Sequence, residues 1–103
     1  MELLPDELKS RLPPLRSQEA ADEPVVYAQY FLPNTGRNWY AIEGEPEDED
    51  YLFFGFVTGI ADEFGHFRLS EIQTLRGPNG ETVERDLSFT EGKLTDVVPA
   101  PDL

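Results

Sequence analysis

The sequence predicts a single α+β domain, with an antiparallel β-sheet of four to five strands and two short helices. Aromatic and β-branched residues concentrate between residues 25 and 69, where turn-forming residues interrupt them, and this pattern favours strands joined by short connections. Near the N-terminus leucines recur every four residues, which indicates an amphipathic helix. A chain of 103 residues is long enough for one hydrophobic core.

The N-terminal segment 1–15 predicts a short helix that prolines bring to an end. Leu4, Leu8 and Leu12 share one helical face, and charged residues fall between them. The prolines at 13–14 prevent continuation, because proline lacks a backbone N–H and clashes with the preceding turn. Such a short helix is unstable alone, so we expect its leucines to dock on the sheet.

Four segments predict the strands that follow: 25–31, 39–43, 51–57 and 65–69. The segment 51–57 is almost wholly apolar, which is typical of a strand buried on both faces. Turn residues at 33–36 favour an antiparallel return of the second strand beside the first. We expect these strands to supply much of the core, through Trp39, Tyr40, Ile42, Phe53, Phe54, Phe56 and Leu69.

The C-terminal third predicts one more helix and one more strand. Ser70 and Gln73 have capping-box spacing, so a brief helix should begin there. Polar and apolar residues alternate over 81–89, which is typical of a half-exposed edge strand. We therefore expect a globular domain over residues 1–89 and an extended or frayed tail over residues 90–103.

The charge balance limits the functions that the chain can perform. Eight Lys and Arg against 21 Asp and Glu give a formal charge of −13. This charge argues against direct binding to nucleic acid or to anionic membranes, because phosphate binding takes cations. It attracts a basic protein, and it also keeps a small protein soluble. No apolar run reaches the roughly 18–20 residues of a membrane span, and no signal peptide is evident, so we expect a cytoplasmic protein.

Six of the eight residues in Glu43–Asp50 are acidic, and we expect residues 44–50 to form a loop between two strands. The run could be a cation site, a solvated loop or a contact surface for a basic partner. It lacks the spaced ligands, central Gly and closing Glu of a calcium loop, so we expect no metal and no tight divalent-ion binding. The candidate partner-binding residues are the acidic side chains with an aromatic anchor beside them: Glu45, Glu47, Asp48, Glu49, Asp50 and Tyr51.

The sequence assigns no catalytic residue and no cofactor. Cysteine is absent, and the glycines form no phosphate-binding pattern. His66 is the only histidine, and Ser70 lies across a predicted strand-to-helix junction from it. A deep pocket with a buried carboxylate or with Arg85 would favour an enzyme, whereas exposed carboxylates clustered on one face would favour a binding protein.

Six segments, in order, carry a resemblance to a known family: Leu8–Glu19, Val26–Phe31, Trp39–Gly44, Phe53–Val57, Gly65–Ile72 and Val83–Leu87. Together they resemble the bacterial family called domain of unknown function 2958, small proteins of plasmids, integrative elements and phages. The resemblance extends to about Phe89. The family has no established catalytic residues to carry over, and at His66 it more often has tyrosine, which argues against a required histidine.

The resemblance implies a mobile-element context, and the charge adds a class of partner. The leading hypothesis is a small acidic, non-enzymatic interaction protein that binds a basic protein, as an anti-defence inhibitor or a nucleic-acid mimic that presents carboxylates in place of phosphates. Two alternatives remain: a small enzyme of unrecognised chemistry, and a structural accessory domain of a plasmid maintenance or transfer complex.

Overall fold

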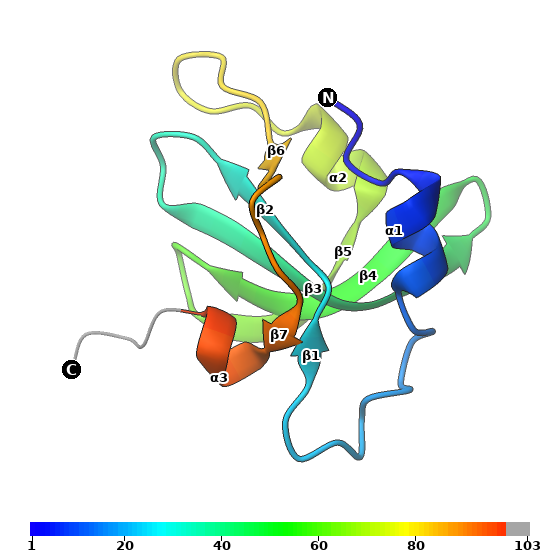
Figure 1. The fold of residues 1–103 in the computed structure, drawn as a ribbon. Helices are drawn as coiled ribbons and strands as arrows, with labels where there is room; N and C mark the ends of the chain where they lie inside the picture. Colours follow the sequence, from blue (N-terminus) through cyan, green and yellow to red (C-terminus); the bar gives the residue numbers. More distant parts are fainter. Residues whose placement is uncertain (99–103) are drawn as a thin grey trace.

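The computed structural model describes residues 1–98 and confirms the α+β class, with a five-stranded antiparallel sheet at its centre (Figure 1). The strands are β1 (Val25–Val26), β2 (Ala28–Leu32), β3 (Arg37–Glu47), β4 (Asp50–Thr58), β5 (Glu63–Arg68), β6 (Glu84–Arg85) and β7 (Gly92–Lys93). Within the described residues there are three helices, where the sequence predicted two: α1 (Asp6–Arg11), α2 (Leu69–Thr74) and α3 (Leu94–Val97).

The central sheet has the strand order β5-β4-β3-β2-β6, and β1 pairs with β7 in a separate two-stranded sheet. The long β3–β4 hairpin forms the middle of the larger sheet (Figure 1). Its register shifts once, because Ala41 pairs with Gly55 while Glu43 pairs with Phe54. The extra residue, Ile42, makes a β-bulge, and a bulge redirects the side chains that follow it.

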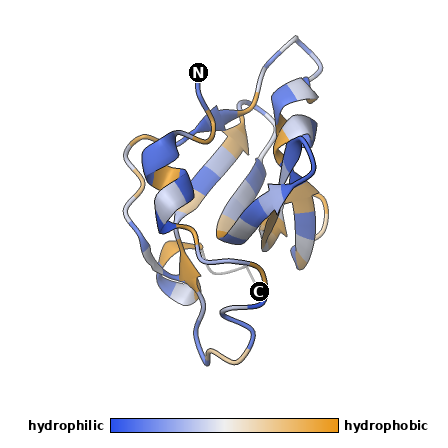
Figure 2. Ribbon diagram, turned by 90° about the vertical axis from the view of Figure 1, so that its right-hand side faces the viewer, coloured by the Kyte–Doolittle hydropathy of each residue, from blue (hydrophilic) through white to orange (hydrophobic). Residues whose placement is uncertain are grey.

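Each face of the central sheet packs against different elements, and Figure 2 shows how hydrophilic and hydrophobic residues alternate along the strands. On the helix face, α1 and α2 cover strand residues such as Tyr30 and Phe53, and the three leucines predicted to dock are all buried there. The opposite face, here called the open face, carries Tyr40, Ile42 and Phe56, and α3 covers only part of it.

Phe53 lies at the centre of the helix face and is fully buried. Its ring stacks on Phe67 with centroids 4.9 Å apart and meets the edge of Tyr30 at 5.8 Å. The predicted core is therefore right for Trp39, Tyr40, Ile42 and Phe53 and only partly right for the others, because Phe54, Phe56 and Leu69 are half-buried. Phe54 and Phe56 alternate with Phe53 along β4, so they lie on the open face.

The C-terminal segment differs from the expected tail. Residues 90–98 contain β7 and α3, and Leu94, Val97 and Val98 pack against the cluster formed by Tyr40 and Ile42. These apolar residues are too few to show periodicity in the sequence, which is why no helix was expected here. In the structure they cover the part of the open face around Tyr40 and Ile42. Residues 99–103 of the expected tail lie outside the described residues.

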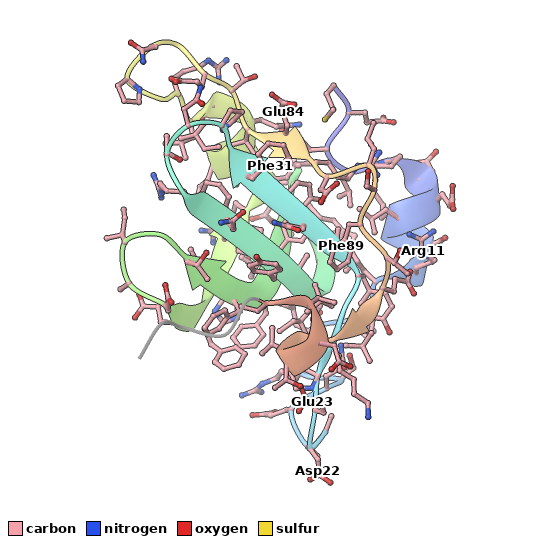
Figure 3. All side chains as sticks on the ribbon, turned by 60° about the vertical axis from the view of Figure 1, so that its left-hand side comes forward. Arg11, Asp22, Glu23, Phe31, Glu84 and Phe89 are labelled. Atoms are coloured by element: carbon pink, nitrogen blue, oxygen red, sulfur yellow. The ribbon has the colours of Figure 1, made fainter. Side chains whose placement is uncertain are left out.

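The expected edge strand over 81–89 is reduced to β6, which pairs with β2 through Phe31 and Glu84 (Figure 3). Beyond Arg85 the chain turns. The N–H of Ser88 bonds to the Asp86 carboxylate, and the N–H of Phe89 bonds to the Asp86 carbonyl oxygen. A side chain that bonds to its own neighbouring backbone competes with the ladder, which ends the strand early.

Truncating Phe53 tests which aromatic residue is central. We expect Phe53→Ala to lower the free energy of unfolding by about 3–5 kcal/mol, the usual range for a fully buried phenylalanine. Phe54→Ala, on the neighbouring position of the same strand, should cost clearly less because its ring is only half-buried. Urea unfolding of both variants measures the difference. Equal losses would contradict the assignment of the two faces.

Candidate functional site

The acidic run is mostly strand rather than the expected loop. β3 continues to Glu47 and β4 begins at Asp50, so only Asp48 and Glu49 form the turn, with Asp48 at a φ of 54°. The hairpin extends this far because residues 44–47 of β3 pair with the apolar start of β4. Four carboxylates of the run, those of Glu43, Glu45, Glu47 and Asp50, project from this hairpin toward defined partners.

Glu43 is the one buried acidic residue in the described part of the chain, with 4% of its surface exposed. The bulge at Ile42 turns it toward the open face. There one carboxylate oxygen accepts the backbone N–H of Arg16 and the other that of Gln18, each at 2.7 Å. The segment 15–24, here called the connector, is thereby fastened over the sheet.

Three more acidic residues of the run stabilise the fold. Glu45 accepts the Leu15 N–H at 3.0 Å, which adds to the hold on the connector. Glu47 forms an ion pair with Arg68, its oxygen lying 2.8 Å from Nη2 and 2.9 Å from Nε. Asp50 accepts both the hydroxyl and the N–H of Ser70, so it binds the first turn of α2.

These contacts also revise the predicted capping of the second helix. The helix begins at Leu69, two residues earlier than a Ser70 cap implies. Ser70 donates to Asp50 across the sheet, and the Glu71 carboxylate accepts the Arg68 N–H at 3.3 Å. The Asp50 carboxylate, from another element, therefore accepts hydrogen bonds at the start of the helix, where the sequence predicted a Ser70 side-chain cap. It can do so because the hairpin places Asp50 beside the first turn of α2.

Of the six predicted partner-binding residues, only Asp48 and Glu49 are exposed acids for which the structure shows no hydrogen bond within residues 1–98. Tyr51 is 5% exposed and packs on Phe53 with ring centroids 5.0 Å apart. Its ring lies where a Cβ on Gly44 would be, and burial raises the Tyr51 pKa. Tyr51 is therefore a core residue and not the exposed anchor that the sequence suggested.

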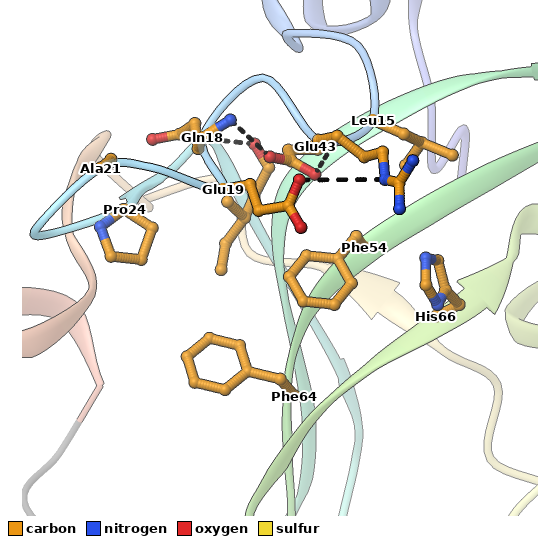
Figure 4. Close-up of a pocket in the computed structure, with 11 residues that line it drawn as sticks. Leu15, Gln18, Glu19, Ala21, Pro24, Glu43, Phe54, Phe64 and His66 are labelled. Atoms are coloured by element: carbon orange, nitrogen blue, oxygen red, sulfur yellow. Dashed lines mark hydrogen bonds and ion pairs between the residues drawn. The ribbon is translucent and has the colours of Figure 1, made fainter.

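A cavity of about 450 Å³ lies between the connector and the open face (Figure 4). Its floor is aromatic: Phe54 stacks on Phe64 at 5.9 Å and tilts against His66 at 5.1 Å. Phe64 is 50% exposed. Phe54, Phe64 and His66 are here called the aromatic patch, and among the described residues Phe64 is the exposed large apolar residue that lines this cavity.

The connector forms the roof of this cavity and is held by polar contacts. The Gln18 side chain accepts the Val25 N–H at 2.7 Å and donates to the carbonyl oxygens of Val25 and Ile42, both at 3.0 Å. At the rim, Arg16 and Glu19 are exposed and lie 3.8 Å apart. The cavity thus combines an aromatic floor with a charged rim, an arrangement that suits a cationic or a flat apolar group.

The cavity contains a buried carboxylate, the feature that would favour an enzyme. Both Glu43 oxygens accept backbone N–H groups, so this carboxylate holds the connector in place. Arg85 lies on β6, at the opposite edge of the sheet from β5, and its buried Nε has no hydrogen-bond partner within residues 1–98. In the same residues no group of three or more His, Asp or Glu could hold a metal ion.

The chain matches the family model described as "Protein of unknown function (DUF2958)" over residues 3–98. The chain belongs to this family. No curated protein and no solved structure matches it. No helix in the part of the chain that the structure describes is long and apolar enough to cross a membrane. Family membership thus confirms the resemblance and leaves function to be argued from the surface.

Sequence reasoning missed the aromatic patch in this member of the family. The apolar pattern of the segment 51–57 predicts that Phe54 and Phe56 are core residues. No pattern in the sequence predicts a position for Phe64. The spacing Phe64–His66 could have indicated two side chains on one face of a strand. Only the register, in which Phe54 pairs with His66, shows that they adjoin Phe54.

Replacing Glu43 tests its role in fastening the connector. We expect Glu43→Gln to lower the free energy of unfolding by roughly 1.5–3 kcal/mol, because the amide replaces one charge-assisted acceptor with a donor that faces a backbone N–H. Proteolysis within residues 15–24 should also accelerate. Glu45→Gln, which loses only the contact to Leu15, is the matched control. A neutral Glu43→Gln variant would show that the connector is held by other contacts.

The hydrogen bonds to Asp50 predict a pH dependence. The Ser70 hydroxyl and the Tyr51 N–H hold the Asp50 pKa below its ordinary value. Because the folded-state pKa is depressed, its contribution to stability is present above the ordinary pKa and is lost as the pH falls through the folded value. Ser70→Ala should raise the Asp50 pKa and shrink this loss, as measured by carboxyl-carbon NMR titration. Ser88→Ala, whose hydroxyl makes no hydrogen bond within residues 1–98, should leave it unchanged.

Proposed function

We propose that this chain is a small acidic, non-enzymatic interaction protein that binds a basic protein in the cytoplasm. In the mobile-element setting that the family resemblance implies, the partner would be a defence protein or a protein that handles nucleic acid. The carboxylates would then stand where phosphates otherwise bind. The proposal requires that the surplus negative charge be available at the surface.

The observation that supports the proposal is that most of this charge is displayed rather than neutralised. Among the described residues, the structure shows three arginines in ion pairs with acidic side chains: Arg11, Arg16 and Arg68. The exposed acids that take no part in these ion pairs are more numerous: Glu2, Asp6, Asp22, Asp48, Glu49, Asp62, Glu63, Glu71 and Asp96. Such a surface steers a basic partner toward the molecule and raises the rate of encounter.

Charge alone gives little affinity, because exposed ion pairs contribute about 0–1 kcal/mol each. An apolar anchor is also needed, and stable interfaces usually provide an aromatic one. Since Tyr51 is buried, the aromatic patch takes the place of the anchor in this proposal. Phe64 is half exposed and stacked on Phe54, so its ring is already fixed before a partner arrives.

The test neutralises the two exposed acids at the hairpin tip. A partner is first captured from lysate of the native host at low salt, identified and purified. Its affinity for the Asp48→Asn/Glu49→Gln variant is then measured by calorimetry and should fall by about 3- to 10-fold, with a weaker salt dependence. The matched control, Asp22→Asn/Asp96→Asn, removes the same charge at the other end of the molecule.

Two outcomes would contradict the proposal. One is that no basic protein is captured at low salt by the folded chain. The other is a partner whose affinity is insensitive to salt, since attraction between exposed charges is screened over about 8–10 Å at ordinary ionic strength. Equal losses in the tip variant and the control would keep the proposal but remove the hairpin tip as its centre.

A further inference from the structure

The starting observation is that β5 is an edge strand. It pairs with β4 on one side, and no described strand pairs with it on the other. An unpaired edge offers backbone N–H and C=O groups to any extended chain. On this sheet the opposite edge, β6, is only two residues long, whereas β5 has six.

The hydrogen bonds at the end of β5 show which groups face outward. The N–H of Arg68 bonds to the Glu71 side chain and not to β4. Because backbone N–H groups alternate in direction along a strand, those of Phe64 and His66 also point away from β4. An added strand would therefore form its ladder with Phe64 and His66.

The side chains at these two positions are the exposed part of the aromatic patch. Residues of an added strand that pair with Phe64 and His66 would direct their side chains to the open face, two residues apart. Directly opposed side chains have Cβ atoms about 4.5–5.5 Å apart. A cation at such a position would lie within the roughly 6 Å over which it is attracted by an aromatic ring.

Charge decides between the candidate occupants of this edge. Asp62 and Glu63 stand exposed at the start of β5, and Glu19 lies on the rim of the adjoining cavity. A second copy would bring another formal charge of −13 to the same edge, which opposes self-pairing. A basic segment gains from the same field.

We propose that the free edge of β5 binds an extended basic segment of the partner, by strand addition. Lysine or arginine at alternate positions of that segment would lie on Phe64 and His66, next to the cavity under the connector. This inference rests on the proposed function and names the surface and the conformation through which it acts. Backbone bonds would supply affinity, and the aromatic patch would select cations.

The probe is a capped synthetic peptide of alternating threonine and arginine, nine residues long. At low salt we expect it to slow hydrogen exchange of the Phe64 and His66 amides and to shift their NMR signals. The same peptide with its arginine amides N-methylated keeps the charge but cannot form the ladder, and it should bind about 3- to 10-fold more weakly. A peptide with glutamate in place of arginine should not bind.

Variants of the protein test the same geometry from the other side. His66→Pro removes an outward N–H that β4 does not use, and proline is tolerated at such edge positions. It should weaken binding of the arginine peptide about 3- to 10-fold more than His66→Thr, which loses the same ring but keeps the N–H. Phe64→Leu keeps apolar area without an aromatic ring and should weaken it about 2- to 5-fold. Leu87→Ala, at an exposed residue away from β5, is the control.

The outcomes separate this inference from the proposed function. If the arginine peptide binds in a salt-dependent way but N-methylation and His66→Pro change nothing, strand addition is overturned and acidic binding stands. If the arginine peptide does not bind at low salt, strand addition is overturned, and the capture experiment decides the proposed function. Concentration-dependent dimers that His66→Pro dissolves would make a second copy the occupant and overturn this inference alone.

Discussion

The bulge at Ile42 and the carboxylate of Glu43 that it redirects are what the rest of the structure depends on. Without the extra residue, Glu43 would point to the helix face, into the hydrophobic cluster. With it, the carboxylate reaches the backbone N–H groups of Arg16 and Gln18 and fastens the connector. Opposite the bulge, Gly55 lies so close to the Tyr40 carbonyl oxygen that a Cβ would collide with it. The roof of the cavity and the exposure of the aromatic patch follow from this one irregularity.

The aromatic patch is exposed because the open face is only partly covered. Phe54 and Phe64 lie on the open face through the alternation of their strands, and they stay partly exposed because α3 and the connector together cover only part of that face. Burying them fully would take more chain than the C-terminal segment described here provides. A half-covered sheet face next to an unpaired edge combines apolar area with backbone groups, and binding by strand addition needs both. The hydrophobic core itself is complete on the helix face, so the patch is available without loss of the main packing.

The strands, the docking of α1 and the central place of the aromatic segment could be predicted from the sequence because they are local patterns. Leu4, Leu8 and Leu12 predict their own burial through their spacing. The bulge could not be predicted, because no local pattern distinguishes Ile42 from an ordinary strand residue. The sequence predicts a loop for the acidic run because carboxylates are usually solvated. The backbone N–H groups that bind Glu43 and Glu45 come from residues about 25 to 30 positions away, so no local pattern could indicate them. Composition indicated the charge, and only the register showed which carboxylates remain exposed.

A chain with eight cations cannot pair its 21 acids with side chains, and here backbone amides take over that task. Glu43 and Glu45 accept N–H groups of the connector, Asp50 that of Ser70, and Glu23, on the connector beside α3 (Figure 3), that of Thr95. The bond to Thr95 lowers the Glu23 pKa, which favours the charged form. These four carboxylates depend on amides and not on scarce arginines, so a cation would not displace their partners, whereas the contact of Glu47 with Arg68 does rely on an arginine. Under the proposed function, the acids that meet the partner are exposed ones outside these contacts, so strong electrostatic attraction is compatible with a stable structure.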